Sequence, residues 1–377
     1  MPNLDVVLDF VYVIAQKRLS SARYLMKVGI SVAGLFLGLG SLVGSFSYEG
    51  FTLSADSNSS PVIPFIINGF ACLGLASLAI GILLEIYEHL WGEASKDNRA
   101  KSIDLRSLTA AKAPTLSKSF PSLVESSGIH DALFLETKPG ESLTAWLTRS
   151  TGALSKFARE DLVKINDFES EHPLAMGALA HVPHCFALGF LVANRRLVHY
   201  YCWNRDSKKT EKSRWIDCRD QRTRGQSISG QVNIIQSEHV TKPEDVTKIG
   251  LSIELSIPSS PEKFLEKIGV GVVYQIGLKN QSIGNIFSEK EQVKIVCEIR
   301  ELINNNILAR YKNVKELHLS ITGQASFIMR LAADMNQNHL PKAIKVYHFE
   351  NQNYSWCFEL SPNSNSVQFS VLTNKEA

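Results

Sequence analysis

Two short turns in this chain carry side chains suited to holding an anion. The first, "HVPH" (181–184), follows the apolar run "LAMGALA" and precedes a helical pattern. The second, "TGQ" (322–324), follows the alternating run "LHLSI" and leads, with Ser326, into another helical pattern. If each run is a parallel strand, its turn lies at the carboxyl edge of a sheet, where helix N-termini expose N–H groups. Such an edge suits phosphate groups.

Aromatic and basic residues follow the neighbouring strands. The run "LVHYYCW" ends at Trp203 and enters the basic hairpin "NRDSKKTEKSR", and "AIKVYHF" ends at Phe349. Aromatic rings stack on bases, and Lys and Arg bind anions. The alternative is that the hairpin is simply solvated, the histidines are ordinary loop residues, and Trp215 and Trp356 are core. The predicted ligand-binding residues are His181, Pro183, His184, Trp203, Asn204, Arg205, Lys209, Arg214, Thr322, Gly323, Gln324, Ser326 and Phe349.

The sequence contains no familiar catalytic or metal-binding pattern. It has no Gly-x-Ser-x-Gly elbow, P-loop, His-Glu-x-x-His or usefully spaced acid pair. The six cysteines are scattered without a Cys-x-x-Cys pair, which indicates reduced, mostly buried thiols and no metal. This pattern favours a sensor without a cofactor over an enzyme.

The two turns belong to a repeated order of elements. Strand, short turn, apolar helix, aromatic-ended strand, polar hairpin and Trp-led strand occur from residue 174 and again from residue 317. Phe186 matches Phe327 in this repeat, and Trp215 matches Trp356. The first helix is expected to begin after His184. The sequence therefore predicts an α/β fold of two similar halves over residues 166–377.

The first quarter of the chain is far more apolar than the rest. Residues 28–47 carry no charge, and the run 62–86 is strongly apolar up to Leu84. Each is about the 20 residues that a helix needs to cross a bilayer, so both are predicted transmembrane helices. The whole chain of 377 residues has a net charge of only +3, which gives no argument for DNA binding.

The charges beside the predicted spans set their orientation. Basic residues lie before the first span (17–27) and after the second (96–106), whereas the loop 48–61 has none. Basic flanks stay in the cytoplasm, so both termini are expected there and the loop outside. Residues 1–27 are predicted to hold an interfacial helix, and residues 87–165 a connector.

Both predicted spans contain small or polar residues among their apolar ones. Glycines four residues apart let helices approach closely in lipid. They can pack the two spans of one chain together or join spans of several chains. The predicted packing residues are Gly34, Gly38, Gly40, Gly44, Asn68, Ser77 and Gly81.

The stretches "GALAHVPHCFALGFLVANRRLVHYYCWNRD" and "ELHLSITGQASFIMRLAADMN" resemble the SAVED domain, a fusion of two CARF-like Rossmann halves. With two N-terminal spans, the chain resembles the transmembrane-SAVED effectors of CBASS anti-phage defence. The resemblance implies a cyclic di- or trinucleotide ligand made by a CD-NTase. Ligand binding would drive oligomerisation and disruption of the bacterial inner membrane, ending in growth arrest or cell death.

Two other functions fit the same residues. A membrane-anchored interaction protein needs only the spans and a folded domain. An enzyme that cleaves such nucleotides would use His181 or His184 as an acid–base group.

Overall fold

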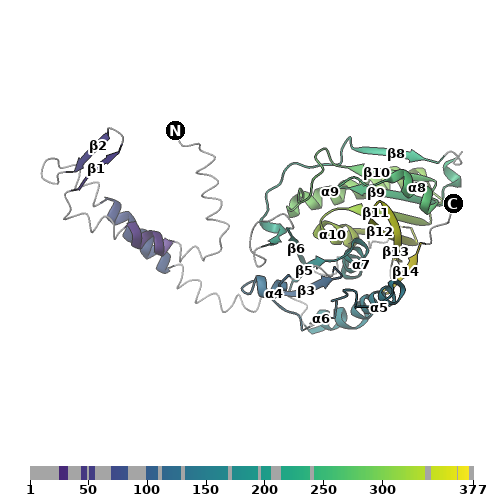
Figure 1. Cartoon of the computed structure of the whole chain (residues 1–377), viewed down its shortest axis with the longest axis horizontal. Helices are drawn as coiled ribbons and strands as arrows, with labels where there is room; N and C mark the ends of the chain where they lie inside the picture. The colour runs from purple at the N-terminus through teal and green to yellow at the C-terminus, as the bar shows by residue number, and fades with distance from the viewer. Residues whose placement is uncertain are drawn as a thin grey trace. The chain divides into compact units, whose positions relative to one another are not determined.

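The structure is a computed structural model that divides into two units, Met1–Asp97 and Asn98–Ala377, each described here by itself. Figure 1 shows the elements of both units with their labels. The described residues are 25–32, 44–48, 51–55, 69–83, 99–108, 113–128, 132–168, 172–193, 197–204, 214–237, 242–335, 341–362 and 364–372.

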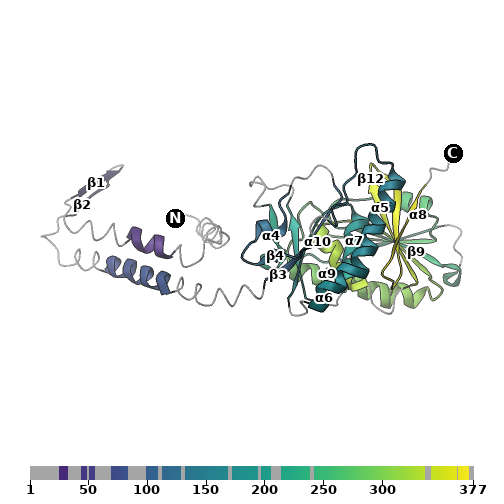
Figure 2. The same cartoon turned by 90° about the horizontal axis from the view of Figure 1, so that it is seen from below.

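The described part of the first unit contains two helical segments and a hairpin. Segments 25–32 and 69–83 lie side by side in Figures 1 and 2. A Cβ on Gly29 would lie 2.6 Å from the backbone nitrogen of Leu78 and 2.7 Å from the carbonyl oxygen of Gly74. The Ser77 hydroxyl donates to the carbonyl of Leu25 at 3.3 Å. The two segments therefore pack closely within one chain.

The hairpin corrects the predicted first span. Strand β1 (Gly44–Tyr48) pairs antiparallel with β2 (Phe51–Ala55), so Gly44 lies in a strand rather than at a helix contact. The alternation of Ser with Phe and Tyr after Gly44 favours a strand, and only two residues separate the two strands. Ser77 and Gly81 lie in segment 69–83. Gly34, Gly38, Gly40 and Asn68 lie outside the described residues.

The two predicted spans fall largely outside the described residues as well. Within the described parts of the chain, no helix combines the length and the apolar character that crossing a bilayer requires.

The second unit contains two mixed sheets, as far as its residues are described. The first sheet has the order β4-β3-β5-β6-β7, parallel except for β7. The second has the order β14-β13-β12-β11-β9-β10-β8, with parallel β12, β11, β9 and β10 at its centre. The strands are β3 (Ala100–Arg106), β4 (Val124–Ser126), β5 (Leu174–Leu179), β6 (Val198–Trp203), β7 (Trp215–Asp217), β8 (Val232–Gln236), β9 (Lys248–Glu254), β10 (Val272–Gly277), β11 (Glu316–Thr322), β12 (Ala343–Glu350), β13 (Asn353–Leu360) and β14 (Val367–Val371).

Helices lie between the sheets and on their outer sides (Figure 2). They are α4 (Leu116–Ser119), α5 (Leu143–Lys156), α6 (Leu162–Phe168), α7 (Val182–Val192), α8 (Pro261–Ile268), α9 (Glu289–Glu301) and α10 (Ala325–Met335). A π-helical turn joins α5 to α6, and another continues α9. Helix α7 begins at Val182, three residues before the predicted start, because Pro183 suits the first helical turn, where its missing N–H costs nothing.

The predicted repeat recurs in the topology. Both β5-α7-β6-β7 and β11-α10-β12-β13 are a parallel crossover followed by an antiparallel hairpin. In the first hairpin Trp203 pairs with Trp215, and in the second Phe349 pairs with Tyr354. Tyr354 therefore occupies the position of Trp215, whereas the predicted match, Trp356, pairs with Val371.

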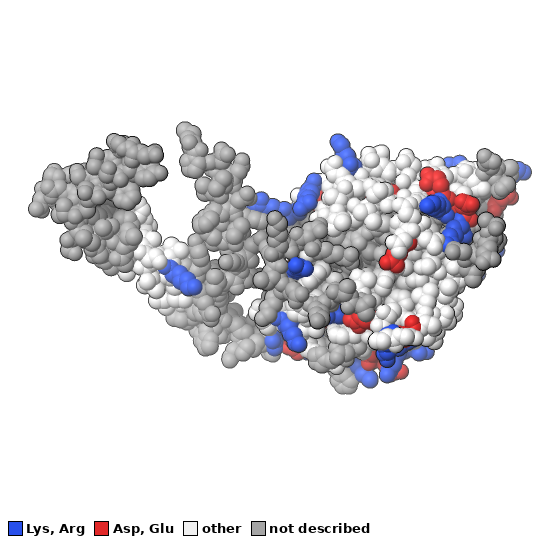
Figure 3. Space-filling model, in the orientation of Figure 1, with Lys and Arg blue, Asp and Glu red and all other residues white. Residues whose placement is uncertain are grey.

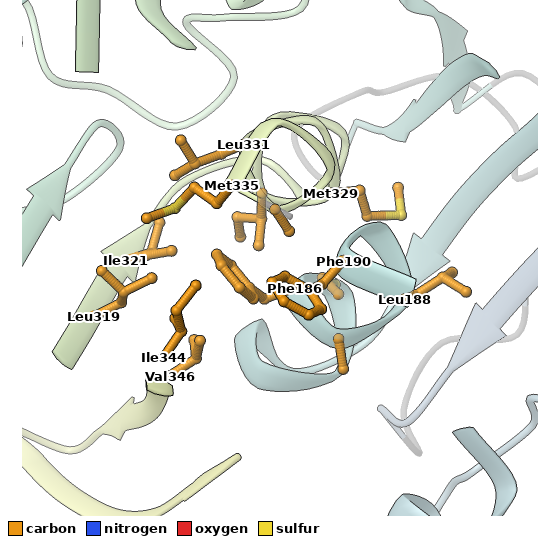
Figure 4. Packing of buried hydrophobic residues seen from close by; sticks show 14 of the residues in the cluster. Phe186, Leu188, Phe190, Leu319, Ile321, Met329, Leu331, Met335, Ile344 and Val346 are labelled. Carbon is orange, nitrogen blue, oxygen red and sulfur yellow. The ribbon is translucent and has the colours of Figure 1, made fainter. Parts of the chain in front are cut away.

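Helices α7 and α10 join the two halves. Helix α7 contacts β12 and β13 of the second sheet, and α10 contacts β5 and β6 of the first. A Cβ on Gly189 of α7 would lie 2.1 Å from the carbonyl oxygen of Met329 on α10, so the two backbones almost touch. Figure 4 shows buried side chains of α7, α10, β11 and β12, among them Phe186 and Ile321, gathered into one cluster.

The region predicted as a connector contains a central strand. Strand β3 lies between β4 and β5 and is largely buried. Its sequence contains charged residues, which can be buried because they have partners elsewhere in the chain. Lys101 pairs with Glu125, and Asp104 accepts the N–H of Leu116 at 3.0 Å. Residues 99–165 thus belong to the α/β unit wherever they are described.

Replacing Gly189 by Ala is expected to lower the free energy of unfolding by about 2 kcal/mol or more, because the new methyl group overlaps the backbone of Met329. Urea unfolding of the full chain, followed by tryptophan fluorescence, measures the change. Gly152→Ala is the matched control, since nothing lies within 4 Å of that position on α5. Gly152→Ala is expected to leave the free energy of unfolding unchanged or to raise it by up to about 1 kcal/mol. Equal losses in both variants would contradict the close packing.

Candidate functional site

The carboxyl ends of β3 and β5 place Ser107 beside His181. The two strands are paired, with Arg106 opposite Leu179. The Ser107 hydroxyl oxygen accepts the backbone N–H of His181 at 2.9 Å and lies 2.7 Å from its Nδ1. His181 is the residue before α7, and its side chain does not cap that helix. The serine therefore holds this imidazole at the carboxyl edge of the first sheet.

His181 meets the second sheet at this edge. Its ring lies 4.9 Å, centroid to centroid, from that of His348 near the carboxyl end of β12. The His348 ring stacks on Trp356 of β13 at 4.9 Å, and its Nε2 lies 3.3 Å from a carboxylate oxygen of Glu350. The carboxyl edges of the two sheets thus converge on a pair of histidines.

His184 lies beneath this pair, in the first turn of α7. Its side chain is fully buried among the rings of Trp146, Trp356 and Phe358, at centroid distances of 5.1, 5.6 and 4.7 Å. Neither ring nitrogen has a hydrogen-bond partner within the described residues. Burial lowers the pKa of His184 well below its ordinary value. We call His181, His184 and His348 the histidine joint.

The buried histidine should make the fold sensitive to acid. The unfolded His184 binds a proton below about pH 6.5, whereas the folded one resists it, so stability is intact above that pH and falls below it. His184→Phe is expected to make the free energy of unfolding fall less as the pH is lowered. For one titrating group this fall is at most about 1.4 kcal/mol per pH unit. Urea unfolding between about pH 7.5 and 5 tests this. Identical pH slopes for the variant and the natural chain would contradict the assignment.

The second predicted turn is buried and internally bonded. Thr322 and Gln324 are each 8% exposed, and Ser326 is fully buried. The Thr322 hydroxyl donates to the carbonyl of Ile257, and the carbonyl of Thr322 accepts the N–H groups of the two residues after β9. The turn therefore holds the loop that follows β9.

Gln324 holds the loop that follows β10, and Ser326 bonds to α9. With its side-chain oxygen turned toward that loop, Gln324 accepts the N–H groups of Gly284, Asn285 and Ile286 at 3.2, 3.0 and 3.1 Å. The Ser326 hydroxyl accepts a hydrogen bond from the side-chain amide of Gln292 at 2.8 Å. Ligand contacts at these residues remain a prediction, but their side chains already serve the fold.

The other predicted residues are distributed over the unit. Trp203 packs edge-on against Trp215 at 5.3 Å, and the N–H of Asn204 donates to the carbonyl of Arg214 at 2.9 Å. Phe349 packs on Tyr354 at 5.0 Å. Pro183 is buried in the first turn of α7, and Gly323 is partly exposed; Arg205 and Lys209 lie outside the described residues.

Three residues of the site carry no sequence signal. Ser107 lies in the region predicted as a connector, and Trp146 lies on α5 in the same region. His348 is hidden inside a strand whose last aromatic residue, Phe349, is the more obvious candidate. His348 and Phe349 are adjacent on β12 and so lie on opposite faces of the sheet, and His348 is the one that contacts His181.

On the face seen in Figure 3, acidic and basic residues are interspersed rather than gathered into one field. Among the residues whose placement is described, no three His, Cys, Asp or Glu side chains are arranged to hold a metal ion.

Comparison with known proteins identifies the family. The model of the SAVED family, "SMODS-associated and fused to various effectors sensor domain", matches residues 154–360. Because this match covers more than half of the chain, the protein belongs to the SAVED family. No curated protein matches it.

Solved structures that match this chain include two complexes of an Acinetobacter baumannii Cap4 SAVED/CARF-domain containing receptor. With the cyclic trinucleotide 3'3'3'-cAAA the TM-score is 0.41, and with 2'3'3'-cAAA it is 0.43. Both are 12% identical, and the alignment covers 78% of this chain and 60% of the receptor. The Moraxella osloensis Cap4 receptor is 10% identical with a TM-score of 0.37, over 89% of this chain and 74% of the receptor. This chain thus spans about 60% of the length of the Acinetobacter receptor.

Proposed function

We propose that this chain is a membrane effector of bacterial anti-phage defence that responds to a cyclic oligonucleotide. Its two CARF-like halves bind a cyclic di- or trinucleotide made by a CD-NTase, and bound chains oligomerise. The assembled N-terminal units then disrupt the inner membrane, and the infected cell stops growing or dies. Both termini lie in the cytoplasm, and the chain itself carries out no chemical reaction.

Membership of a sensor-domain family carries the ligand-binding part of the proposal. The meeting of two carboxyl sheet edges at His181 and His348 supports it, because ligands of open α/β sheets bind at such edges. Ligand binding assembles the chains only if it favours the assembled state over the monomer.

The surface of segment 69–83 supports the membrane part of the proposal. Its buried positions are small residues, Ala71, Gly74 and Gly81. Its large apolar residues are exposed instead, and they include Leu73 at 65% and Leu83 at 66%. A helix in water buries its large apolar side chains, whereas helices in lipid pack through small residues and present large ones to the acyl chains.

The enzyme alternative has less support. Of the two histidines that it would use, His184 is fully buried and would have to become exposed before it could act as an acid–base group on a nucleotide, which leaves the partly exposed His181. The second candidate function is that of a membrane-anchored interaction protein. Under this alternative, the chain would bind no nucleotide.

Titration calorimetry of the full chain in detergent tests ligand binding. The probes are 3'3'3'-cAAA and 2'3'3'-cAAA, the ligands named for the Acinetobacter receptor, together with a panel of cyclic dinucleotides. We expect one of them to bind and to be recovered intact after long incubation. Cleavage of the ligand would favour the enzyme, and binding of none would contradict the proposal.

Gly29→Leu tests the membrane part. The larger side chain should separate segments 25–32 and 69–83, so ligand-induced dye release from vesicles should fall while ligand affinity stays unchanged. Gly69→Leu is the matched control, since nothing lies within 4 Å of Gly69. Undiminished release from Gly29→Leu vesicles would show that this contact does not form part of the disruptive assembly.

A further inference from the structure

The histidine joint brings three imidazoles together from both halves of the unit. His181 directly precedes α7 and His184 lies in its first turn, and their ring centroids are 5.7 Å apart. His348 comes from β12. Ser107, the residue after β3, lies beside them with Trp146 of α5 and Trp356 of β13. Glu350 is the charged group bonded to His348, and its side chain is 67% exposed.

Burial disfavours the protonated form of two histidines of the joint, His184 and His348. Burial lowers the pKa of His184 and of His348, and the two neighbouring imidazoles lower that of His184 further. A neutral imidazole such as that of His348 presents little charge to an anion. An anion bound beside the two rings would reverse the balance, because a negative charge close to an imidazole favours its protonated form.

The two helix N-termini that follow β5 and β11 are not equivalent. At α10, Ser326 is bonded to Gln292 and Gln324 to the loop after β10, so the polar side chains of that turn are occupied. At α7, His181 makes no side-chain cap, and the buried His184 has no hydrogen-bond partner at either ring nitrogen among the residues that the structure describes. The α7 end is therefore the one that retains unused hydrogen-bonding groups.

We propose that His181 and His348 form the anion subsite of this chain, that the subsite holds one phosphate group of the ligand, and that the pair takes up one proton as the phosphate binds. The inference rests on the proposed function and specifies where the two halves together hold a phosphate group of the ligand. The proton comes from solvent and adds to a neutral imidazole, which then donates an N–H to a phosphate oxygen; no covalent bond of the ligand changes. The turn Thr322–Ser326 acts instead as a support for the loops after β9 and β10.

Calorimetry of the full chain with 3'3'3'-cAAA, or with whichever cyclic nucleotide binds, tests the proton. At neutral pH the measured heat should change with the ionisation enthalpy of the buffer, corresponding to uptake of about one proton. Affinity should weaken by up to about tenfold per pH unit as the pH rises above neutral. Tight binding with a heat independent of the buffer overturns the inference but leaves the proposed function intact. Absence of binding by the natural chain overturns both.

Three variants locate the proton. His348→Gln keeps a hydrogen-bonding side chain but cannot be protonated, so it should abolish the buffer dependence and lower affinity. Glu350→Gln removes the carboxylate bonded to His348 and should raise affinity. Ser326→Ala is the control: it should lower the melting temperature of the free chain and leave the buffer dependence unchanged. Buffer dependence that survives in His348→Gln but disappears in Ser326→Ala would place the subsite at the other turn.

Discussion

The near contact of two helix backbones at Gly189 and Met329 organises the second unit. Because α7 has a glycine there, it can lie directly on α10, and each helix then packs against the sheet of the other half. Helix α7 is apolar on almost every side, as expected for a helix enclosed by protein. The same arrangement brings the first turn of α7 against β12 and β13, so the histidine joint is a consequence of how the helices pack.

Polar residues at the two carboxyl edges serve different purposes. At the second sheet, Thr322 and Gln324 are buried and bonded to neighbouring loops, and the buried Ser326 is bonded to Gln292 of α9. Buried polar groups are almost always paired, so these side chains are expected components of a stable turn. At the first sheet, both ring nitrogens of the buried His184 lack a hydrogen-bond partner among the described residues. Departures from such rules are expected at functional sites, so this edge is the one where we look for a binding role.

The two units follow opposite rules of packing. The second unit encloses its large apolar side chains in cores that include Phe186 and Leu319. In the first, segment 69–83 buries Gly74 and exposes Leu73 and Leu83. The first arrangement is driven by removing apolar surface from water, and the second suits a surrounding as apolar as the side chains themselves.

The sequence by itself determined the α/β class, the repeated order of strand, helix and hairpin, and two turns of interest, because these depend on local alternation and periodicity. It misplaced Gly44, since a glycine in an apolar run reads the same in a helix and in a strand. It also missed β3, because the partners of Lys101 and Asp104 are distant in sequence. Only the tertiary structure decided that His181 meets His348 and that Ser326 meets Gln292. Such pairs join residues far apart along the chain, and no local pattern records which distant residue will fill a given contact.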